Sequence, residues 1–168
     1  VARESRETIL KTALNGVREE FEFVVIDCPP SLGLLTLNAL AVSSSVLIPM
    51  QCEYYALQGL SHLLKTLKLV KKSINPDLKV EGILLTMFDS RTLLASQVKD
   101  QVQKYFSVFL LKTVIPRNVR LSEAPSHGKP IMLYASRSRG ADSYVELAKE
   151  IISRSKTDER TSLSGSAV

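Results

Sequence analysis

The sequence contains only two cysteines, Cys28 and Cys52. Two thiols supply neither a disulfide framework nor a four-ligand zinc site, and they suit a reducing cytosol. No apolar run approaches the ~18 residues of a membrane span. The charges within the opening residues VARESRETILKTAL exclude a secretory signal. These absences predict a cytoplasmic protein with no membrane partner.

The 168 residues are 45% hydrophobic and 23% charged, which is an ordinary globular balance. A chain of this length buries a core without help from disulfides or a metal, and its composition excludes general disorder, collagen and a coiled coil. Lysine and arginine number 22 against 17 aspartate and glutamate residues, for a formal charge of +5. That excess permits a polyanionic partner without requiring one.

Short apolar runs alternate with segments of helical periodicity along the chain. The apolar runs predict buried strands at 21–27, 44–50, 80–88 and 110–116. Helical spacing predicts helices at 3–17, 31–42, 56–73, 92–105 and 142–153. Because the connections are long enough for crossovers, the expected fold class is α/β, with a mostly parallel sheet flanked by helices. We expect one domain over residues 1–154 and a polar, flexible tail over 155–168.

Ligands of open parallel sheets bind beyond the carboxyl ends of the strands. Three polar loops follow predicted strands here: DCPPS, DSRT and PRNVRLSEAPSHGKP. Asp27 closes its apolar run, as the metal-side aspartate of P-loop nucleoside triphosphatases does. An isolated run of this kind more often merely ends a strand or caps a helix. The following Pro-Pro favours the functional interpretation, because it imposes the stiff, extended exit that suits a nucleotide-sensing loop.

Positive charge gathers between Lys112 and Arg139. This stretch has six basic residues and one acidic residue, Glu123, so its excess of five equals that of the whole chain. One interpretation is a solvated basic loop. The other is a surface that contacts the phosphate backbone of duplex DNA without sequence preference.

Three segments, in this order and spacing, resemble the ParA/Soj family of partition ATPases: VVIDCPPSLGLLTLNAL, LLTMFDSRT and VIPRNVRLSEAPSHGKPI. The family belongs to the deviant Walker-A P-loop ATPases. The resemblance extends from about Val1 to Ile152, and the run SEAPSHGKP is highly specific to the chromosomal Soj-like branch. It implies a P-loop NTPase-like fold and a chromosome- or plasmid-partitioning ATPase that uses ATP and Mg²⁺.

The resemblance also implies roles for individual residues. Asp27 matches the catalytic, Walker-B-type aspartate that lies near Mg²⁺ and holds it through water. The switch that follows the nucleotide state would comprise Pro29, Pro30 and Ser31, and the nucleotide-binding residues around the adenine would be Met87, Pro116 and Arg117. The residues that bind DNA would be Arg91, Arg120 and Lys129. In this family, two subunits form a homodimer with ATP held between them, and the dimer binds double-stranded DNA without sequence preference. A ParB-type centromere-binding protein stimulates hydrolysis.

The chain departs from the family because it contains no G-x-x-x-x-G-K-[ST] loop and no lysine-rich variant of one. Without that loop nothing cradles the phosphates, and Asp27 alone cannot assemble a Mg²⁺ site. In the family this loop belongs to the first strand–helix unit, which would precede Val1. We therefore expect an incomplete P-loop NTPase-like fold, the C-terminal portion of a family member that does not hydrolyse ATP alone.

Two alternatives stay open. One is a protein without a P-loop that binds DNA or a partner and does not hydrolyse ATP; the other is a MinD-like septum-site regulator. The MinD type ends in a basic amphipathic helix that lies on membranes, whereas the tail TDERTSLSGSAV has only Leu163 and Val168 as sizeable apolar residues. This favours a nucleoid-associated protein over a membrane-anchored one.

Overall fold

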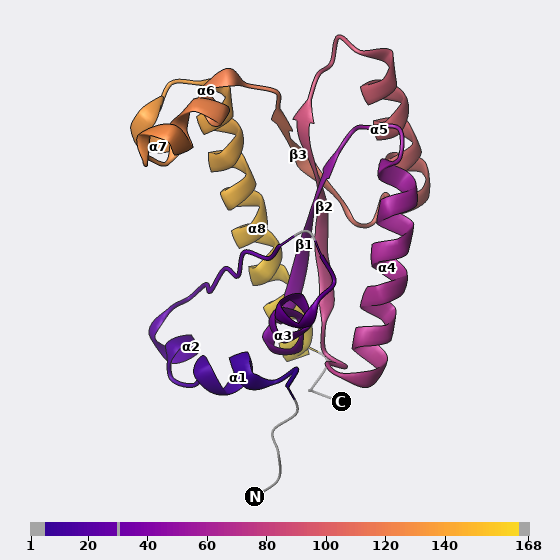
Figure 1. The fold of residues 1–168 in the computed structure, drawn as a ribbon, viewed down its shortest axis with the longest axis vertical. Helices are drawn as coiled ribbons and strands as arrows, with labels where there is room; N and C mark the ends of the chain where they lie inside the picture. The colour runs from indigo at the N-terminus through magenta and orange to yellow at the C-terminus, as the bar shows by residue number, and fades with distance from the viewer. Residues whose placement is uncertain (1–5, 30, 165–168) are drawn as a thin grey trace, which may run out of the picture. The chain divides into compact units, whose positions relative to one another are not determined.

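The computed structural model describes residues 6–29 and 31–164. Its elements follow in the order α1 (Ile9–Ala13), α2 (Val17–Glu20), α3 (Leu34–Val42), β1 (Ser45–Gln51), α4 (Ala56–Ser73), β2 (Lys79–Phe88), α5 (Leu93–Phe106), β3 (Leu110–Pro116), α6 (Val119–Glu123), the 3₁₀ helix η1 (Ala124–His127), α7 (Ile131–Tyr134) and α8 (Arg139–Ser164). The strands form one sheet in the order β1-β2-β3, and β2 and β3 are parallel (Figure 1). The predicted class, α/β with a parallel sheet and flanking helices, is confirmed.

The chain divides into two compact units: Val1–Val46 with Ser61–Val80, and Leu47–Leu60 with Glu81–Val168. In the first unit, the buried Asn38 joins α1 to α3. Its amide nitrogen donates to the carbonyl oxygens of Arg6 and Leu34 at 2.8 and 3.0 Å, and its oxygen accepts from the backbone N–H of Leu10 at 3.1 Å. The five-residue helix α1 would be marginally stable by itself, so the hydrogen bonds of Asn38 hold it in place.

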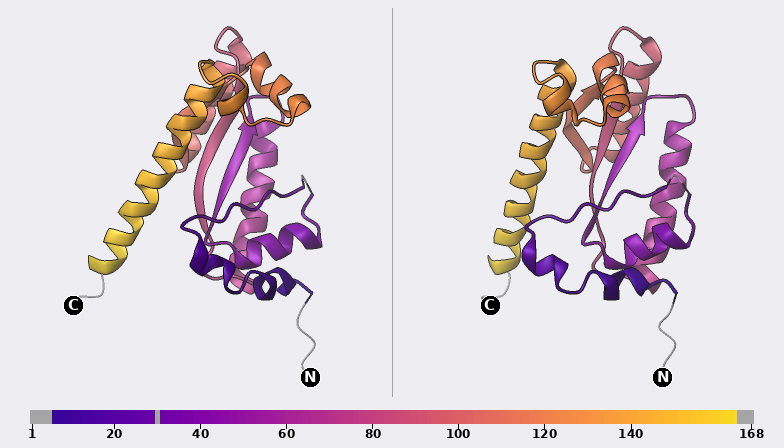
Figure 2. Two further views of the ribbon diagram at one scale, coloured as in Figure 1. Left: turned by 90° about the vertical axis from the view of Figure 1, so that its left-hand side faces the viewer. Right: turned by 60° about the vertical axis from the view of Figure 1, so that its left-hand side comes forward.

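In the second unit, α5 and α8 lie on opposite sides of β2 and β3 (Figures 1 and 2). The packing of α8 on β3 forms a buried hydrophobic cluster of Leu84, Leu111, Ile115 and Leu147. At the carboxyl ends of the two strands, Phe88 is in register with Pro116. The loops that follow β2 and β3 therefore begin side by side.

The strand predicted at 21–27 is wrong. Among the described residues this run belongs to no strand, and its side chains are exposed, Val25 to 91%, except for the half-buried Ile26. A strand requires backbone partners for its N–H and C=O groups, and the sheet of the described residues consists of β1, β2 and β3. The apolar composition indicated burial but could not supply the missing ladder.

The helix predicted at 3–17 is replaced, within the described residues, by the two short helices α1 and α2. Gly16 separates them with a φ of 90°, a conformation that glycine adopts without steric cost. The helix predicted at 142–153 is longer at both ends, since α8 begins at Arg139 and continues to Ser164. The loop after β3, predicted without helices, folds into α6, η1 and α7.

Candidate functional site

The carboxyl ends of β2 and β3 bring together the three predicted nucleotide-binding residues, Met87, Pro116 and Arg117. Pro116 pairs with Phe88 across the ladder, and the backbone N–H of Arg117 donates to the Phe88 carbonyl at 3.0 Å. Met87 is 45% exposed and has a φ of 49°, in the left-handed region that residues with a Cβ rarely adopt. Strain of this kind is concentrated at ligand-binding edges of folds.

Arg91 lies in the loop between β2 and α5, where Asp89 holds it. Its side-chain Nε and Nη2 donate to the two Asp89 carboxylate oxygens at 2.9 and 2.7 Å, and its backbone N–H donates at 3.1 Å. The side-chain hydrogen bond from Arg91 is the main reason why the pKa of Asp89 falls to about 2. The Arg91 side chain is still 85% exposed, so its other N–H groups face solvent and can bind an anion.

Arg120 lies in α6, which Asn118 caps by accepting the Arg120 backbone N–H at 2.9 Å. Its Nη1 donates to Glu123 Oε2 at 2.9 Å, and the Tyr134 hydroxyl donates to the same oxygen at 3.0 Å. The Tyr134 ring in turn stacks on His127, with the ring centroids 4.8 Å apart. Helix α6, η1 and α7 therefore share one polar network that orients a guanidinium whose side chain is 60% exposed.

The same contacts shift the pKa values of both ionised groups. The hydroxyl of Tyr134, followed by Arg120, lowers the pKa of Glu123, while the hydrogen bond to Glu123 raises the pKa of Arg120. Glu123 therefore remains a carboxylate, which keeps the arginine in one orientation.

Replacing Tyr134 by phenylalanine should raise the pKa of Glu123 toward its ordinary value, because the hydroxyl makes the largest contribution to lowering it. An NMR titration of the Glu123 carboxyl carbon measures this change. The control is Tyr144→Phe, which removes a hydroxyl from α8, outside this network. If the titration of Glu123 is the same in wild type and Tyr134→Phe, the hydrogen bond does not operate in solution.

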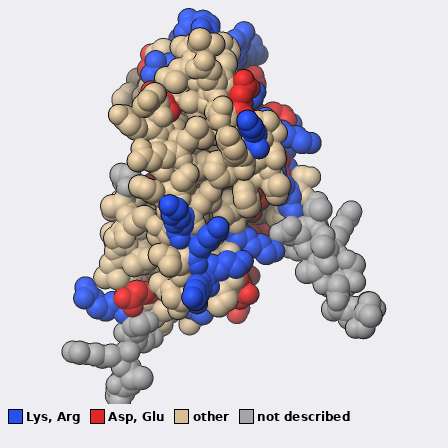
Figure 3. Space-filling view, turned by 90° about the vertical axis from the view of Figure 1, so that its right-hand side faces the viewer, with Lys and Arg blue, Asp and Glu red and all other residues tan. Residues whose placement is uncertain are grey.

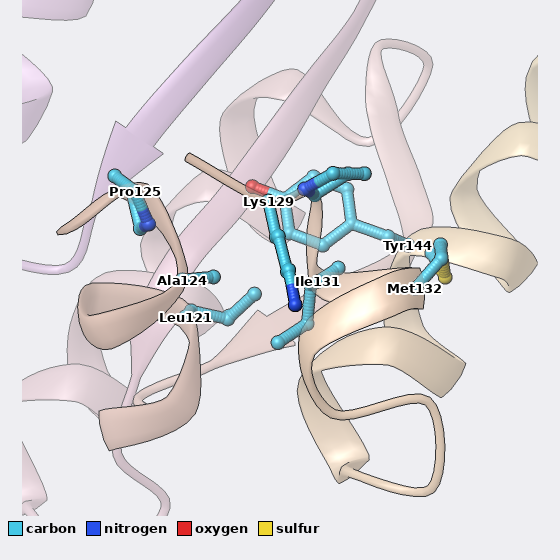
Figure 4. A pocket seen from close by; sticks show the side chains of 8 residues that line it. Leu121, Ala124, Pro125, Lys129, Ile131, Met132 and Tyr144 are labelled. Carbon is cyan, nitrogen blue, oxygen red and sulfur yellow. The ribbon is translucent and has the colours of Figure 1, made fainter. Parts of the chain in front are cut away.

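Lys129 borders an open, mostly apolar hollow of about 360 Å³ beside the same three short helices. Figure 4 shows the surrounding side chains, which come from Leu121, Ala124, Pro125, Pro130, Ile131, Met132 and Tyr144. The backbone N–H of Lys129 donates to the Ala124 carbonyl at 3.2 Å, after Gly128 has ended η1 in the left-handed conformation. These contacts fix the backbone of Lys129 and leave its side chain exposed.

Asp27, Pro29 and Ser31 belong to the first unit, whereas the residues above belong to the second. Asp27 and Pro29 are exposed, and the carbonyl of Ser31 accepts the Thr36 hydroxyl just before α3. Pro30, also predicted in the switch, lies outside the described residues. The sequence places these residues next to one another, and the described part of the chain shows no contact between Asp27, Pro29 and Ser31 that joins them into a binding site.

The described residues do not form a metal site by themselves. Within that part of the chain, no three His, Cys, Asp or Glu side chains lie close enough to share an ion. Asp27 is a single exposed carboxylate. Mg²⁺ commonly takes one or two carboxylates and completes its shell with water and nucleotide phosphates. Asp27 can therefore contribute one contact to an ion that arrives with a nucleotide, and no more.

Sequence reasoning missed the acidic partners of the predicted DNA-binding arginines. The spacing of Arg120 and Glu123 at i and i+3 on one short helix was a usable signal. The pairing of Arg91 with Asp89 was signalled by the D-S-R-T turn, where an aspartate commonly bonds the backbone N–H two residues ahead. Tyr134 had no such signal, because it reaches Glu123 from a separate helix.

Comparison with known proteins identifies the family. The sporulation initiation inhibitor protein Soj of Bacillus subtilis (strain 168) is 64% identical over 147 residues, which cover 88% of this chain and 58% of that protein. The chain belongs to the ParA/Soj family. The chromosome partitioning protein ParA of Myxococcus xanthus is 57% identical over 154 residues, or 92% of this chain and 54% of that protein. The chain thus spans little more than half of the length of these relatives.

Two further comparisons concern a family model and a solved structure. The family model of an AAA domain matches residues 1–80. The structure of cobyrinic acid a,c-diamide synthase from Mycobacterium smegmatis with bound ADP and magnesium is 36% identical and superimposes with a TM-score of 0.75. The match covers 94% of this ParA/Soj chain and 57% of the synthase. No helix among the described residues is both long and apolar enough to cross a membrane.

Proposed function

We propose that the natural protein containing this chain is a chromosome-partitioning ATPase that binds ATP with Mg²⁺, dimerises with ATP bound and binds duplex DNA without sequence preference. Its hydrolysis would be stimulated by a ParB-type centromere-binding protein, and it would work in the cytoplasm on the nucleoid. The observation that carries this proposal is the 64% identity to Soj over 88% of the chain.

The nucleotide part of the proposal concerns two regions. Met87, Pro116 and Arg117 would surround the adenine, which is supported by their position at the adjacent carboxyl ends of β2 and β3. In the other region, Asp27 would act on Mg²⁺ and on hydrolysis, with Pro29, Pro30 and Ser31 as the switch. The phosphates would be bound by a glycine-rich loop supplied from outside these 168 residues.

The DNA part of the proposal assigns Arg91, Arg120 and Lys129 to phosphate contacts. Both arginines are oriented by a carboxylate and remain largely exposed. Carboxylates close to arginines weaken the attraction for a phosphate, but they also spare the side chain the entropy of being ordered on binding. Arg91 and Arg120 are thus presented in fixed directions, as suits contacts to a regular phosphate backbone.

The variant Arg120→Ala should bind duplex DNA more weakly and with a smaller salt dependence, by about 0.9 in the slope of log K against log salt for one phosphate contact. Fluorescence anisotropy with a labelled duplex, in the presence of ATP, measures both quantities. Lys149→Ala is the matched control, because Lys149 is also an exposed cation paired at i,i+3, in its case with Glu146. If Arg120→Ala keeps the wild-type affinity and slope, the DNA assignment of this loop is wrong.

A further inference from the structure

Helix α4 contains an unbalanced set of positive charges. Its eighteen residues, ALQGLSHLLKTLKLVKKS, include four lysines and no acidic residue. The lysines are Lys65, Lys68, Lys71 and Lys72, and all four are exposed. They belong to the first unit and lie outside the basic stretch after β3 to which DNA binding has been assigned.

These lysines have no carboxylate partner among the described residues. Helix α8 is different, because the exposed Lys149 pairs with Glu146, and Arg154 pairs with the less exposed Glu150. A helix that needs only a solvent-exposed face usually carries opposite charges at i,i+3 and i,i+4 spacing on that face. In α4 the neighbours at those spacings, Lys65 with Lys68 and Lys68 with Lys72, have the same sign and repel each other.

The helix dipole accounts for only part of this charge. Cations near a helix C-terminus are stabilised within the last turn, which explains Lys71 and Lys72. Lys65 and Lys68 lie further from the end of the helix and gain little from the dipole. Their repulsion is therefore not offset within the described structure, whereas a bound polyanion would relieve it.

The opposite face of α4 excludes insertion into a lipid bilayer. Leu60, Leu67 and Val70 on that face are buried in the protein, at 3%, 5% and 3% exposure. A helix that lies in a membrane interface must place its apolar face among the lipids. Here the free face carries the four lysines and one large apolar side chain, Leu69 at 66% exposure, so it acts mainly through charge.

Figure 3 shows this side of the molecule, with lysine and arginine gathered over the lower part of α4 and acidic side chains at the margin. Lys65, Lys68 and Lys72 fall on one stripe at spacings of three and four residues. The stripe extends over about 10 Å, at a rise of ~1.5 Å per residue. Duplex DNA presents roughly six phosphate charges over that length.

We propose that Lys65, Lys68 and Lys72 form a second contact surface for the phosphate backbone of duplex DNA. Lysines provide flexible point charges rather than the planar fork of arginine, so this surface would add affinity and no sequence preference. The inference goes beyond the proposed function, which assigns DNA contacts only to Arg91, Arg120 and Lys129.

The test uses the natural protein with the triple substitution Lys65→Gln, Lys68→Gln and Lys72→Gln. Anisotropy with a labelled duplex at several salt concentrations should show a smaller slope of log K against log salt, by about 0.9 for each phosphate that a lysine no longer neutralises. The affinity near 0.1 M salt should fall by roughly eightfold for each such phosphate. Gln removes the charge but keeps a long polar side chain with good helix propensity, and an unchanged circular dichroism spectrum checks that the protein folds.

The control triple is Lys11→Gln, Lys104→Gln and Lys149→Gln, which removes the same charge from separate exposed sites. A weaker affinity in the α4 variant but not in the control supports the inference. Equal losses of affinity in both triples would mean that only the net charge of the protein matters, which would overturn the inference. Wild-type binding by the α4 variant would also overturn it. If the α4 triple binds normally while Arg120→Ala does not, the α4 surface is disproved and the proposed function stands.

Discussion

Removing the carboxylate of Glu150 should lower the free energy of unfolding by about 2 kcal/mol. Glu150 lies on α8, and its two oxygens accept the backbone N–H groups of Lys112 and Thr113 on β3, both at 2.9 Å. Its side chain is 14% exposed. In Glu150→Ala these two amides would lose their acceptor, and only Lys112 is exposed enough to find water readily.

An irregularity in β3 explains why these amides need a side chain. The register pairs Ile83 with Leu110 and Leu85 with Val114, so β2 advances by two residues while β3 advances by four. The extra residues cannot all donate to β2, and β3 is an edge strand of the described sheet, with no strand on its other side. Glu150 replaces the missing ladder bonds and joins α8 to this edge.

The contribution of Glu150 also depends on pH. Burial acts to raise its pKa, but the hydrogen bonds from Lys112 and Thr113, together with nearby Arg154, outweigh burial and lower it below the ordinary value of 4.5. A lowered folded-state pKa means that this stability is present above pH 4.5 and is lost as the pH falls through the folded value. Urea unfolding of wild type and Glu150→Ala at neutral and acidic pH should therefore converge in acid.

The control for this prediction is Glu146→Ala, one turn earlier on α8. Glu146 forms an exposed ion pair with Lys149 and accepts no backbone N–H in the described structure. Exposed pairs of this type contribute ~0–1 kcal/mol, so this variant should unfold close to wild type. If Glu150→Ala is no less stable than Glu146→Ala, the bonds to β3 do not stabilise the fold.

Leu85→Ala should be more destabilising than Glu150→Ala and should lower the free energy of unfolding by about 2–5 kcal/mol. Leu85 is fully buried at 0% exposure on the central strand β2. Truncation forfeits the transfer free energy of the removed methyl groups and leaves a cavity that neighbouring strands cannot fill. Urea or thermal unfolding of the natural protein measures the decrease in stability.

Leu69→Ala is the matched comparison, since Leu69 is 66% exposed on α4. It removes the same atoms from a position where they contact water, and we expect a change within about 0.5 kcal/mol. Similar decreases in both variants would contradict the assignment of Leu85 to a tightly packed core.

Apolar runs and helical periodicity predicted the three strands of the sheet and the helices α4 and α5. The bounds of α4 and β3 agree with the predicted ranges 56–73 and 110–116, and β1, β2 and α5 differ from theirs by one residue at some ends. These segments are short apolar runs or show a clear 3.6-residue pattern, and both signals depend only on neighbours along the chain. The motifs DCPPS, DSRT and SEAPSHGKP also sufficed to predict the family, which the comparisons confirm.

The tertiary structure decided what depends on contacts between distant residues. The run at 21–27 has the composition of a buried strand, yet the described sheet provides it with no partner. The acceptor for the irregular part of β3 is Glu150, 37 and 38 residues further along the chain. Tyr134 reaches Glu123 from another helix. Sequence by itself determined the local elements and the family, because these follow from neighbouring residues; the pairing of polar groups follows from the fold, which brings their atoms within bonding distance.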